Sequence, residues 1–478
     1  MWRLTTKADK AITKTDKGYY VDTKTKEPVT VFGRGFRLND RSEIIPIYIP
    51  DKFRSGHLLW IATTRQGKTR VIENICEQDI FKGYSVAFFD PKCDTDALNK
   101  IVSVAKKAGR EKELLLINPF YPQYSAQFNV LRYFFIPEEL AGIITSGVEA
   151  GKDPFFQKIA YEISIVICIA LVTLAEYEGK KAVLKLNDVK DSIPQDSLRR
   201  LQQNVAAIDK DRAYEMAERI DDIYNLLEAE YIAGDLQKIA SSPVDYFNKV
   251  TTSLRVALTE LCVGSIGRIV GKATENPCIK RLEQGERIIL VVQLGSITGG
   301  QASFNLAKVI FSSFSKFAGR RFLSGKIIDP PFSTVVDECQ SVLYRGIDDS
   351  LAKGGGANWW ISLFCQDPSQ VWGALGKDYG NVIFGNTNTR AFMRCPNIET
   401  AEYASGHFGT EDVFSPILTV GGNPSVREAE RPKVKPDVFM NLQPRQFYLK
   451  TYSGDYYGKT SLVSPSELSI VYPEINAL

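Results

Sequence analysis

The sequence holds few histidines and no paired cysteines. Its 478 residues include 2 histidines and 8 cysteines, and the cysteines are scattered singly without a CxxC spacing. Because zinc sites and disulfide frameworks need closely spaced Cys or His residues, the pattern argues against both. The formal net charge is +3, from 59 basic and 56 acidic residues. So small an excess does not by itself indicate nucleic acid or an anionic membrane as a partner, and any basic groove must be local.

A signal peptide and a long apolar run are also lacking. The first 20 residues have no apolar stretch that could be a secretory signal. The best candidate for a membrane span, "ISIVICIALVTLA" at residues 163–175, has 13 residues, whereas roughly 20 are needed to cross a bilayer. We therefore expect this segment to be a buried core helix and the protein to be cytoplasmic, with no membrane span of its own.

The pattern of apolar residues predicts an α/β fold. Residues 1–50 indicate a small β-hairpin region, and from residue 51 to 135 strand and helix patterns alternate, which is typical of a parallel sheet. Between residues 136 and 262 the strand signals vanish and long helical stretches replace them, which predicts an all-α domain. Strands resume over residues 263–478. The α/β domain is thus expected in two parts, 51–135 and 263–478, interrupted by the helices.

The segment "HLLWIATTRQGKTRVIENI" predicts a phosphate-binding loop between a buried strand and a helix. Matched to G-x-x-x-x-G-K-[ST], only the first position departs, where Ala62 replaces glycine; alanine fits there if its φ stays negative. Lys68 would bind the phosphates and Thr69 would hold Mg²⁺. The expected nucleotide-binding residues are Ala62, Thr63, Thr64, Arg65, Gln66, Gly67, Lys68, Thr69 and Arg70. The alternative is an ordinary strand-to-helix turn.

Two later strands end in polar residues that suit nucleotide hydrolysis. The apolar run "PFSTVV" ends in Asp337, expected on the Mg²⁺ side, and Glu338, expected to orient and polarise the attacking water. The run "WWISLFC" ends in Gln366, which could bond the γ-phosphate and report its loss. Each signal alone is also typical of a polar strand end. Because parallel strands bind ligands at their carboxyl ends, the three together indicate an ATPase with Lys68, Glu338 and Gln366 as catalytic residues.

These motifs, with "FFDPKCDTDAL", "VVDECQSVL" and "NTNTRAFMRCPN", resemble the TraD/TraG family of type IV coupling proteins, and most closely the TraD-type factors of integrating conjugative elements. The resemblance runs from about residue 30 onwards. It implies a RecA-like motor domain that binds ATP and Mg²⁺, an all-α domain that recognises substrate, and a homo-hexamer around a channel for single-stranded DNA. The implied partners are a relaxase and the inner-membrane components of a type IV secretion system, so a peripheral position at the inner membrane is an alternative to a free cytoplasmic one.

The sequence departs from the family pattern at three places. Ala62 and Cys93 stand where the family has glycines, which leaves the geometry of both loops open. Many coupling proteins carry an arginine that acts on the neighbouring subunit's nucleotide, and here Gly355 takes its place. Arg390, Arg394 and Lys353 are the remaining candidates for that cation, and the sequence does not distinguish among them.

Two other functions stay open at the level of sequence. One is a duplex DNA translocase similar to FtsK or HerA, although the helical insertion argues against it. The other is a docking platform that binds nucleotide without turnover, an alternative favoured by Ala62 and by the missing arginine.

Overall fold

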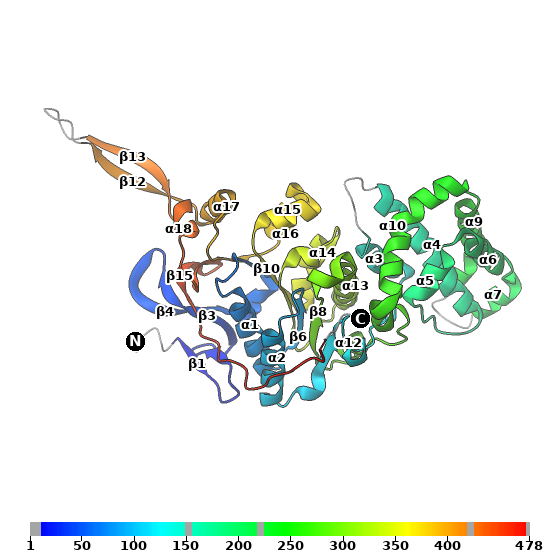
Figure 1. The fold of residues 1–478 in the computed structure, drawn as a ribbon, viewed down its shortest axis with the longest axis horizontal. Coiled ribbons are helices and arrows are strands. Elements are labelled where there is room, and N and C mark those ends of the chain that lie inside the picture. Colours follow the sequence, from blue (N-terminus) through cyan, green and yellow to red (C-terminus); the bar gives the residue numbers. More distant parts are fainter. Residues whose placement is uncertain (1–10, 149–154, 218–223, 418–424, 475–478) are drawn as a thin grey trace.

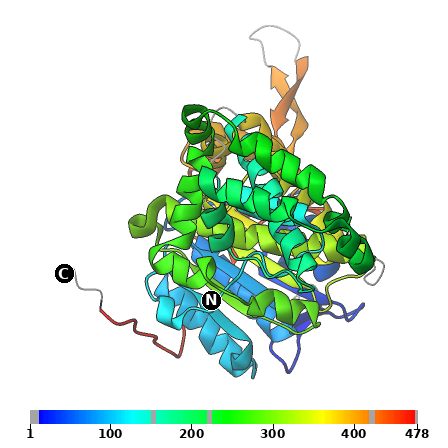
Figure 2. The same cartoon turned by 90° about the vertical axis from the view of Figure 1, so that its right-hand side faces the viewer.

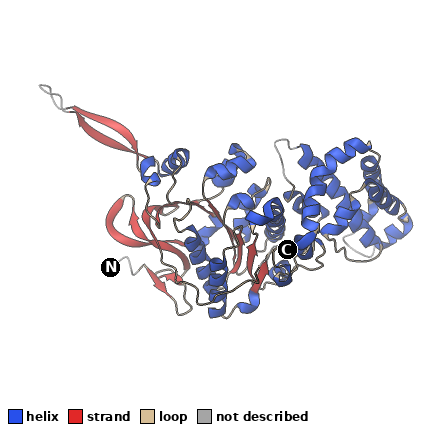
Figure 3. Cartoon of the chain, in the orientation of Figure 1, coloured by secondary structure: helices blue, strands red, loops and turns tan. Residues whose placement is uncertain are grey.

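The computed structural model describes residues 11–148, 155–217, 224–417 and 425–474. Two parts lie side by side, an α/β body built on one large sheet and a region made only of helices (Figure 1). Figure 3 shows the same division, with the strands gathered in one half of the molecule and helices alone in the other.

The middle of the sheet is parallel, as the alternating pattern predicts. The strand order is β11-β5-β10-β9-β6-β8-β7, and every neighbouring pair in this run is parallel. The bounds are β5 Leu58–Ile61, β6 Ser85–Asp90, β7 Leu114–Ile117, β8 Ile289–Gln293, β9 Phe332–Val336, β10 Trp359–Cys365 and β11 Thr389–Phe392. Strands β5, β9 and β10, which precede the predicted phosphate loop, acids and glutamine, are therefore adjacent in the order β5-β10-β9.

Antiparallel strands extend the sheet beyond β11. They follow in the order β14, β15, β3, β2 and β1, with β4 paired to β3. Their bounds are β1 Ile12–Lys14, β2 Tyr20–Asp22, β3 Pro28–Arg37, β4 Asp40–Pro50, β14 Gln446–Thr451 and β15 Gly454–Thr460. The N-terminal hairpin is thus joined to the main sheet through β3 and β15, and does not stand apart from it.

Helices cover both faces of the parallel strands. Alternate residues of a strand point to opposite faces, and in β5 Trp60 packs in one apolar cluster with α1 and α2, whereas Leu59 and Ile61 pack in the other with α13. The helices of the α/β body are α1 Lys68–Lys82, α2 Thr95–Lys107, α13 Ser296–Leu323, α14 Ile347–Lys353, α15 Pro368–Leu375, α16 Lys377–Gly385, α17 Ile398–Phe408 and α18 Pro436–Met440.

A hairpin that the sequence analysis did not predict leaves the body next to α17 and α18. Its strands are β12 Thr410–Ile417 and β13 Ser425–Pro432, and it projects away from the body on the side opposite the helical region (Figure 1).

The helical region is inserted between β7 and β8 and stands in front of the sheet in the turned view (Figure 2). Its helices are α3 Pro137–Ser146, α4 Phe155–Tyr177, α5 Leu186–Ser192, α6 Gln195–Ala206, α7 Lys210–Ala217, α8 Tyr224–Leu227, α9 Ala229–Ala240, α10 Val244–Cys262, α11 Gly264–Ile266 and α12 Pro277–Glu283. Helices therefore continue past residue 262. The predicted domain limits stay predictions.

Helix α4, which contains the apolar run of residues 163–175, is longer than the sequence analysis expected. The helix has 23 residues, not 13, because it begins at Phe155 and continues through the polar residues before the run. Among the described residues it is the one helix long and apolar enough to cross a membrane by length and composition alone, with a mean hydropathy of 2.0. It contacts α3, α5, α6, α8, α9 and α10. These contacts place it at the centre of the helical region, as expected for a core helix.

Candidate nucleotide-binding site

The turn between β5 and α1 has the backbone features of a phosphate-binding loop. Gly67 takes φ 94 immediately before α1, a left-handed conformation that favours glycine. α1 begins at Lys68, and the first turn of a helix presents unpaired N–H groups and a partial positive charge. Because Gly67 has no side chain to cap these groups, they are left for an anion.

Ala62 fits the first position of the loop without backbone strain. Its methyl group is fully buried, and Ala62 is not among the described non-glycine residues with positive φ. Its N–H donates to the carbonyl of Cys365 at 3.1 Å, and the N–H of Thr63 donates to the carbonyl of Arg394 at 3.2 Å. The start of the loop is therefore anchored to the ends of the two neighbouring strands, and a glycine is not required there.

Lys68 and Asp337 form a buried ion pair at the centre of the site. Nζ of Lys68 lies 2.5 Å from Oδ1 of Asp337, and the two side chains are 6% and 4% exposed. The contact balances the charges, but among the described residues the ammonium group has no hydrogen-bond partner of suitable geometry. An ammonium has three donors, and the contact with Asp337 can engage only one of them, so at least two stay unused in a buried place, which is costly. Phosphate oxygens would satisfy them.

Glu338 is held by two side chains from neighbouring strand ends. Its backbone is left-handed, with φ 45. Nε2 of Gln366, after β10, donates to Oε1 of Glu338 at 2.9 Å. Nζ of Lys92, after β6, lies 3.0 Å from the same oxygen and 3.6 Å from Oδ2 of Asp337. The structure thus brings together Asp337, Glu338 and Gln366 as predicted and adds Lys92, which the sequence analysis did not single out.

The electrostatics of this edge follow from burial beside several acids. Burial raises the pKa of Asp90, at the end of β6, to about 6, and the negative charge of Asp337 adds to this rise. Hydrogen bonds from the backbone N–H groups of Asp94 and Lys92 lower the pKa but do not cancel the rise. Burial opposes the charged form of Lys92, but Asp337 and Glu338 outweigh it and raise the pKa of the lysine. Lys92 is therefore a firmly charged ammonium beside the two acids.

A cavity of about 400 Å³ opens in front of these groups. Its lining includes Thr63, Thr64, Arg65, Gly67, Lys68, Thr69, Arg70, Lys92 and Gln366, together with Glu73, Asp94 and Asp96. Ala62 and Gln66 do not line it. Gln66 is buried, and its carbonyl accepts a hydrogen bond from the N–H of Arg445 at 3.0 Å. Asp337 and Glu338 do not line the cavity themselves, but they contact three residues that do, namely Lys68, Lys92 and Gln366.

The residues suit a magnesium ion held jointly with phosphate. Within the described residues, no group of three or more His, Cys, Asp or Glu side chains is arranged to hold a metal ion alone. Mg²⁺ prefers oxygen ligands and usually takes one or two from protein, with substrate phosphates and water completing its shell. The hydroxyl of Thr69 and the carboxylate of Asp337 are of this kind.

The position that carries an arginine in many coupling proteins has no room for a side chain here. A Cβ at Gly355 would lie 2.1 Å from the backbone oxygen of Ser55. The arginine is thus excluded by the packing of this turn against the segment before β5.

The three other candidate cations differ in how many of their N–H donors are already used by neighbouring residues. Arg390 donates to the carbonyls of Thr387 and Phe384 at 3.0 and 2.7 Å, and Lys353 pairs with Asp349 at 2.8 Å. Arg394 is exposed, and its Nε donates to the carbonyl of Met440 at 3.0 Å. Arg394 therefore keeps the most donors for a ligand or a second subunit.

Comparisons with known proteins show which family model and which solved folds this chain is similar to. Residues 331–443 match the family model described as the TraM recognition site of TraD and TraG. The bacterial conjugative coupling protein TrwBdeltaN70 superimposes with a TM-score of 0.61 at 15% identity, covering 91% of this chain and 89% of that one. TrwB in complex with ADP and Mg²⁺ gives 0.61 at 15% identity, covering 92% and 97%. VirB4 of Thermoanaerobacter pseudethanolicus gives 0.51 at 12% identity, covering 92% and 99%. No protein of curated function matches the chain.

The comparisons confirm the fold class and the resemblance to the TraD/TraG family predicted from the motifs. The chain has the RecA-like fold of TrwB, with an all-helical region inserted into it. The residue roles predicted at the site stay predictions.

Proposed function

We propose that this chain is an ATP-driven coupling protein of a conjugative type IV secretion system, which recruits a relaxase bound to DNA and moves single-stranded DNA towards the secretion channel. The observation that carries the proposal is the convergence of Lys68, Asp337, Glu338 and Gln366 beside a cavity of about 400 Å³ at one sheet edge. The structural relative TrwB has been described with ADP and Mg²⁺, which supports ATP and Mg²⁺ as the cofactors here.

Each residue of the site has a distinct part in hydrolysis. The N–H groups of the loop and the ammonium of Lys68 bind the phosphates. Thr69 and Asp337 would hold Mg²⁺, which neutralises phosphate charge when bound. Glu338 orients the attacking water and polarises it, and Gln366 links Glu338 to the end of β10, so loss of the γ-phosphate is passed to that strand.

Lys92 holds Glu338 before nucleotide enters. A cation on the carboxylate weakens it as a proton acceptor. The triphosphate carries more negative charge than one carboxylate, so Lys92 would turn to the phosphates and release Glu338 for water. This lysine supplies from within the subunit part of the positive charge that an arginine at residue 355 would provide from a neighbour.

The partners follow from the resemblance and the matched family model. Residues 331–443 are proposed to bind a TraM-like protein of the DNA-processing complex. We further propose a homo-hexamer, with DNA held through its phosphates so that binding is independent of sequence and weakened by salt. Contact with inner-membrane secretion components would place the ring at the membrane surface.

The test is steady-state phosphate release with single-stranded DNA, duplex DNA or neither. We expect stimulation by the single strand, loss of nucleotide binding in Lys68→Ala, and retained binding with roughly 10²- to 10⁴-fold slower turnover in Glu338→Gln. Stimulation by duplex alone would favour the duplex translocase instead. Equal, near-zero rates in wild type and both variants would leave a docking platform without turnover.

A further inference from the structure

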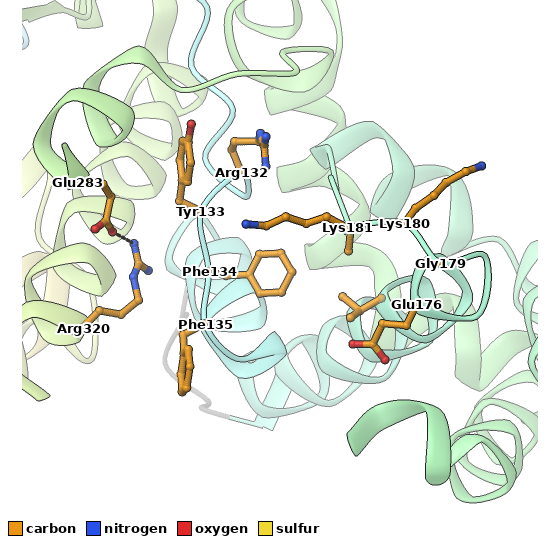
Figure 4. A pocket seen from close by; sticks show the side chains of 12 residues that line it. Arg132, Tyr133, Phe134, Phe135, Glu176, Gly179, Lys180, Lys181, Glu283 and Arg320 are labelled. Atoms are coloured by element: carbon orange, nitrogen blue, oxygen red, sulfur yellow. Dashed lines mark hydrogen bonds and ion pairs between the residues drawn. The ribbon is translucent and has the colours of Figure 1, made fainter. Parts of the chain in front are cut away.

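A second cavity, of about 500 Å³, lies where the helical region meets the α/β body. Figure 4 shows its walls: residues 132–135 before α3 on one side, the end of α4 with residues 179–182 on another, and Arg320 of α13 with Glu283 of α12 on a third. Its volume is typical of a small-molecule site. No group proposed for hydrolysis lies in it.

Three consecutive aromatic residues form one wall. Tyr133, Phe134 and Phe135 all line the cavity, and Phe135 is 76% exposed. In Figure 4 the ring of Phe134 faces the space between the two sides of the cavity. An aromatic ring so exposed offers a face on which another flat ring can stack.

Two cations beside these rings keep unused donors. Nζ of Lys181 points across the cavity towards Arg132 and Phe134 (Figure 4), and within the described residues Lys181 has no ion pair. Arg132 lies 5.1 Å from the ring centre of Tyr133 and its Nε pairs with Glu275 at 3.4 Å, while its Nη1 is buried with no hydrogen-bond partner among the described residues. Arg320, by contrast, is held by Glu139 and Glu283. Lys181 thus supplies the spare positive charge, and Arg132 adds an unused donor beside the aromatic wall.

One acceptor completes the lining. Oε1 of Glu176 receives a weak hydrogen bond from Asn225 at 3.4 Å, while Oε2 is buried without a partner among the described residues. Burial raises the pKa of this carboxyl group. A ligand with an N–H edge would satisfy the oxygen and offset that burial.

We infer that this cavity binds one nucleotide unit, with its phosphate on Lys181 and Arg132 and its base against Phe134 and Phe135. Cation, aromatic face and acceptor match phosphate, base ring and base N–H edge respectively. The inference deepens the proposed function, on which the choice of a DNA strand as the source of the nucleotide rests. A free mononucleotide carries the same groups and is the second source to be distinguished.

The first measurement locates the contact on the full chain. A single strand carrying 5-iododeoxyuridine is irradiated with the protein while a non-hydrolysable ATP analogue fills the phosphate loop, and the cross-linked peptide is identified by mass spectrometry. We expect cross-links at Tyr133, Phe134 or Phe135. Cross-links found elsewhere and absent from these three residues would overturn the inference.

The second measurement uses affinity and matched controls. Phe135→Ala and Lys181→Ala change exposed side chains, so folding should be preserved, and each should weaken binding of a labelled single strand at least about fivefold. Tyr231→Ala, at an aromatic residue that is 80% exposed, and Lys249→Ala, at an exposed lysine, remove one aromatic ring and one lysine elsewhere in the helical region. These two should bind as wild type.

Competition by a nucleoside monophosphate separates the two sources. If the monophosphate displaces the strand only when the monophosphate concentration is far above that of the strand, the cavity is assigned to DNA. If the monophosphate binds tightly and the strand does not bind, the cavity is assigned to a free nucleotide. If neither binds and Phe135→Ala instead changes the oligomeric mass, the aromatic wall is a protein contact and the inference fails. Because these experiments need no turnover, they remain decisive if the ATPase proposal fails.

Discussion

Lys92 and Gln366 contact the same oxygen atom of Glu338. Nζ of Lys92 lies 3.0 Å from Oε1, and Nε2 of Gln366 donates to it at 2.9 Å. The two side chains come from the ends of β6 and β10, which flank β9 on either side. The acid proposed to orient water is therefore clamped between its neighbouring strands, by a cation on one side and an amide on the other.

Removing this cation should slow hydrolysis more than it weakens nucleotide binding. In Lys92→Ala, we expect kcat of phosphate release to fall about 10²-fold, the loss typical of one group that stabilises transition-state charge. Nucleotide affinity measured by calorimetry should change little, because Lys68 and the loop remain.

Two lysine variants serve as controls for that change. Lys92→Arg keeps the charge and should recover part of the rate, whereas Lys106→Ala removes an exposed lysine at the other end of α2 and should leave kcat unchanged. A wild-type rate in Lys92→Ala would show that this lysine has no part in the reaction.

Ala62 and Cys93 stand where the family pattern has glycine, and substituting glycine at these two positions should change stability in opposite directions. Cys93 has φ 60, in the region that favours glycine, so Cys93→Gly should raise the free energy of unfolding by about 1 kcal/mol. Ala62 lies outside that region, so Ala62→Gly should lower it by about 0.5–1 kcal/mol and leave nucleotide affinity within about twofold. Thermal unfolding and calorimetry measure both; a gain in affinity in Ala62→Gly would contradict the loop geometry.

Gly355 should not tolerate even a methyl group. Because a Cβ there would lie 2.1 Å from the backbone oxygen of Ser55, Gly355→Ala should cost about 1–3 kcal/mol of stability, as overpacking commonly does. Gly373, in α15, has open space around its Cβ position. Gly373→Ala should therefore be neutral or slightly stabilising. Equal melting temperatures for the two variants would mean that the turn at Gly355 is looser than the structure shows.

Stability should fall as the pH drops below about 6.5 because of His57. The ring is buried, Nε2 lies 2.7 Å from the carbonyl of Leu351, and Nδ1 accepts from the N–H of Ile361 at 3.1 Å. Burial lowers the pKa of His57 from 6.5 to about 4. Between these two pKa values the unfolded chain therefore binds more protons than the folded one. At pH 5 the resulting loss in the free energy of unfolding is about 2 kcal/mol.

A histidine variant isolates this contribution. His57→Gln keeps a donor and an acceptor but does not titrate, so its melting temperature should depend less on pH between 6.5 and 5 than that of the wild type. The other histidine, His407, is also held neutral by burial, with its pKa lowered to about 4. Parallel melting curves for wild type and His57→Gln over this range would refute the assignment.

Much of the α/β body could be predicted because its signals are local. Buried strands such as β8 and β9 are short apolar runs, and the order strand, glycine turn, lysine, helix around Gly67 is written in consecutive residues. The convergence of Gln366 with Glu338 was also predictable, because parallel strands end at one edge. Lys92 could have been found by the same reasoning, since it follows the strand that ends at Asp90.

The sequence by itself determined most strands and helices of the α/β body and which side chains stand at the strand ends, since both depend on neighbouring residues along the chain. Only the tertiary structure decided that Lys92 contacts Glu338, that the backbone at Ser55 excludes a side chain at Gly355, and that an aromatic and basic cavity forms between the helical region and the body. These features join segments far apart in the sequence. Their geometry depends on how whole elements pack, which no local pattern records.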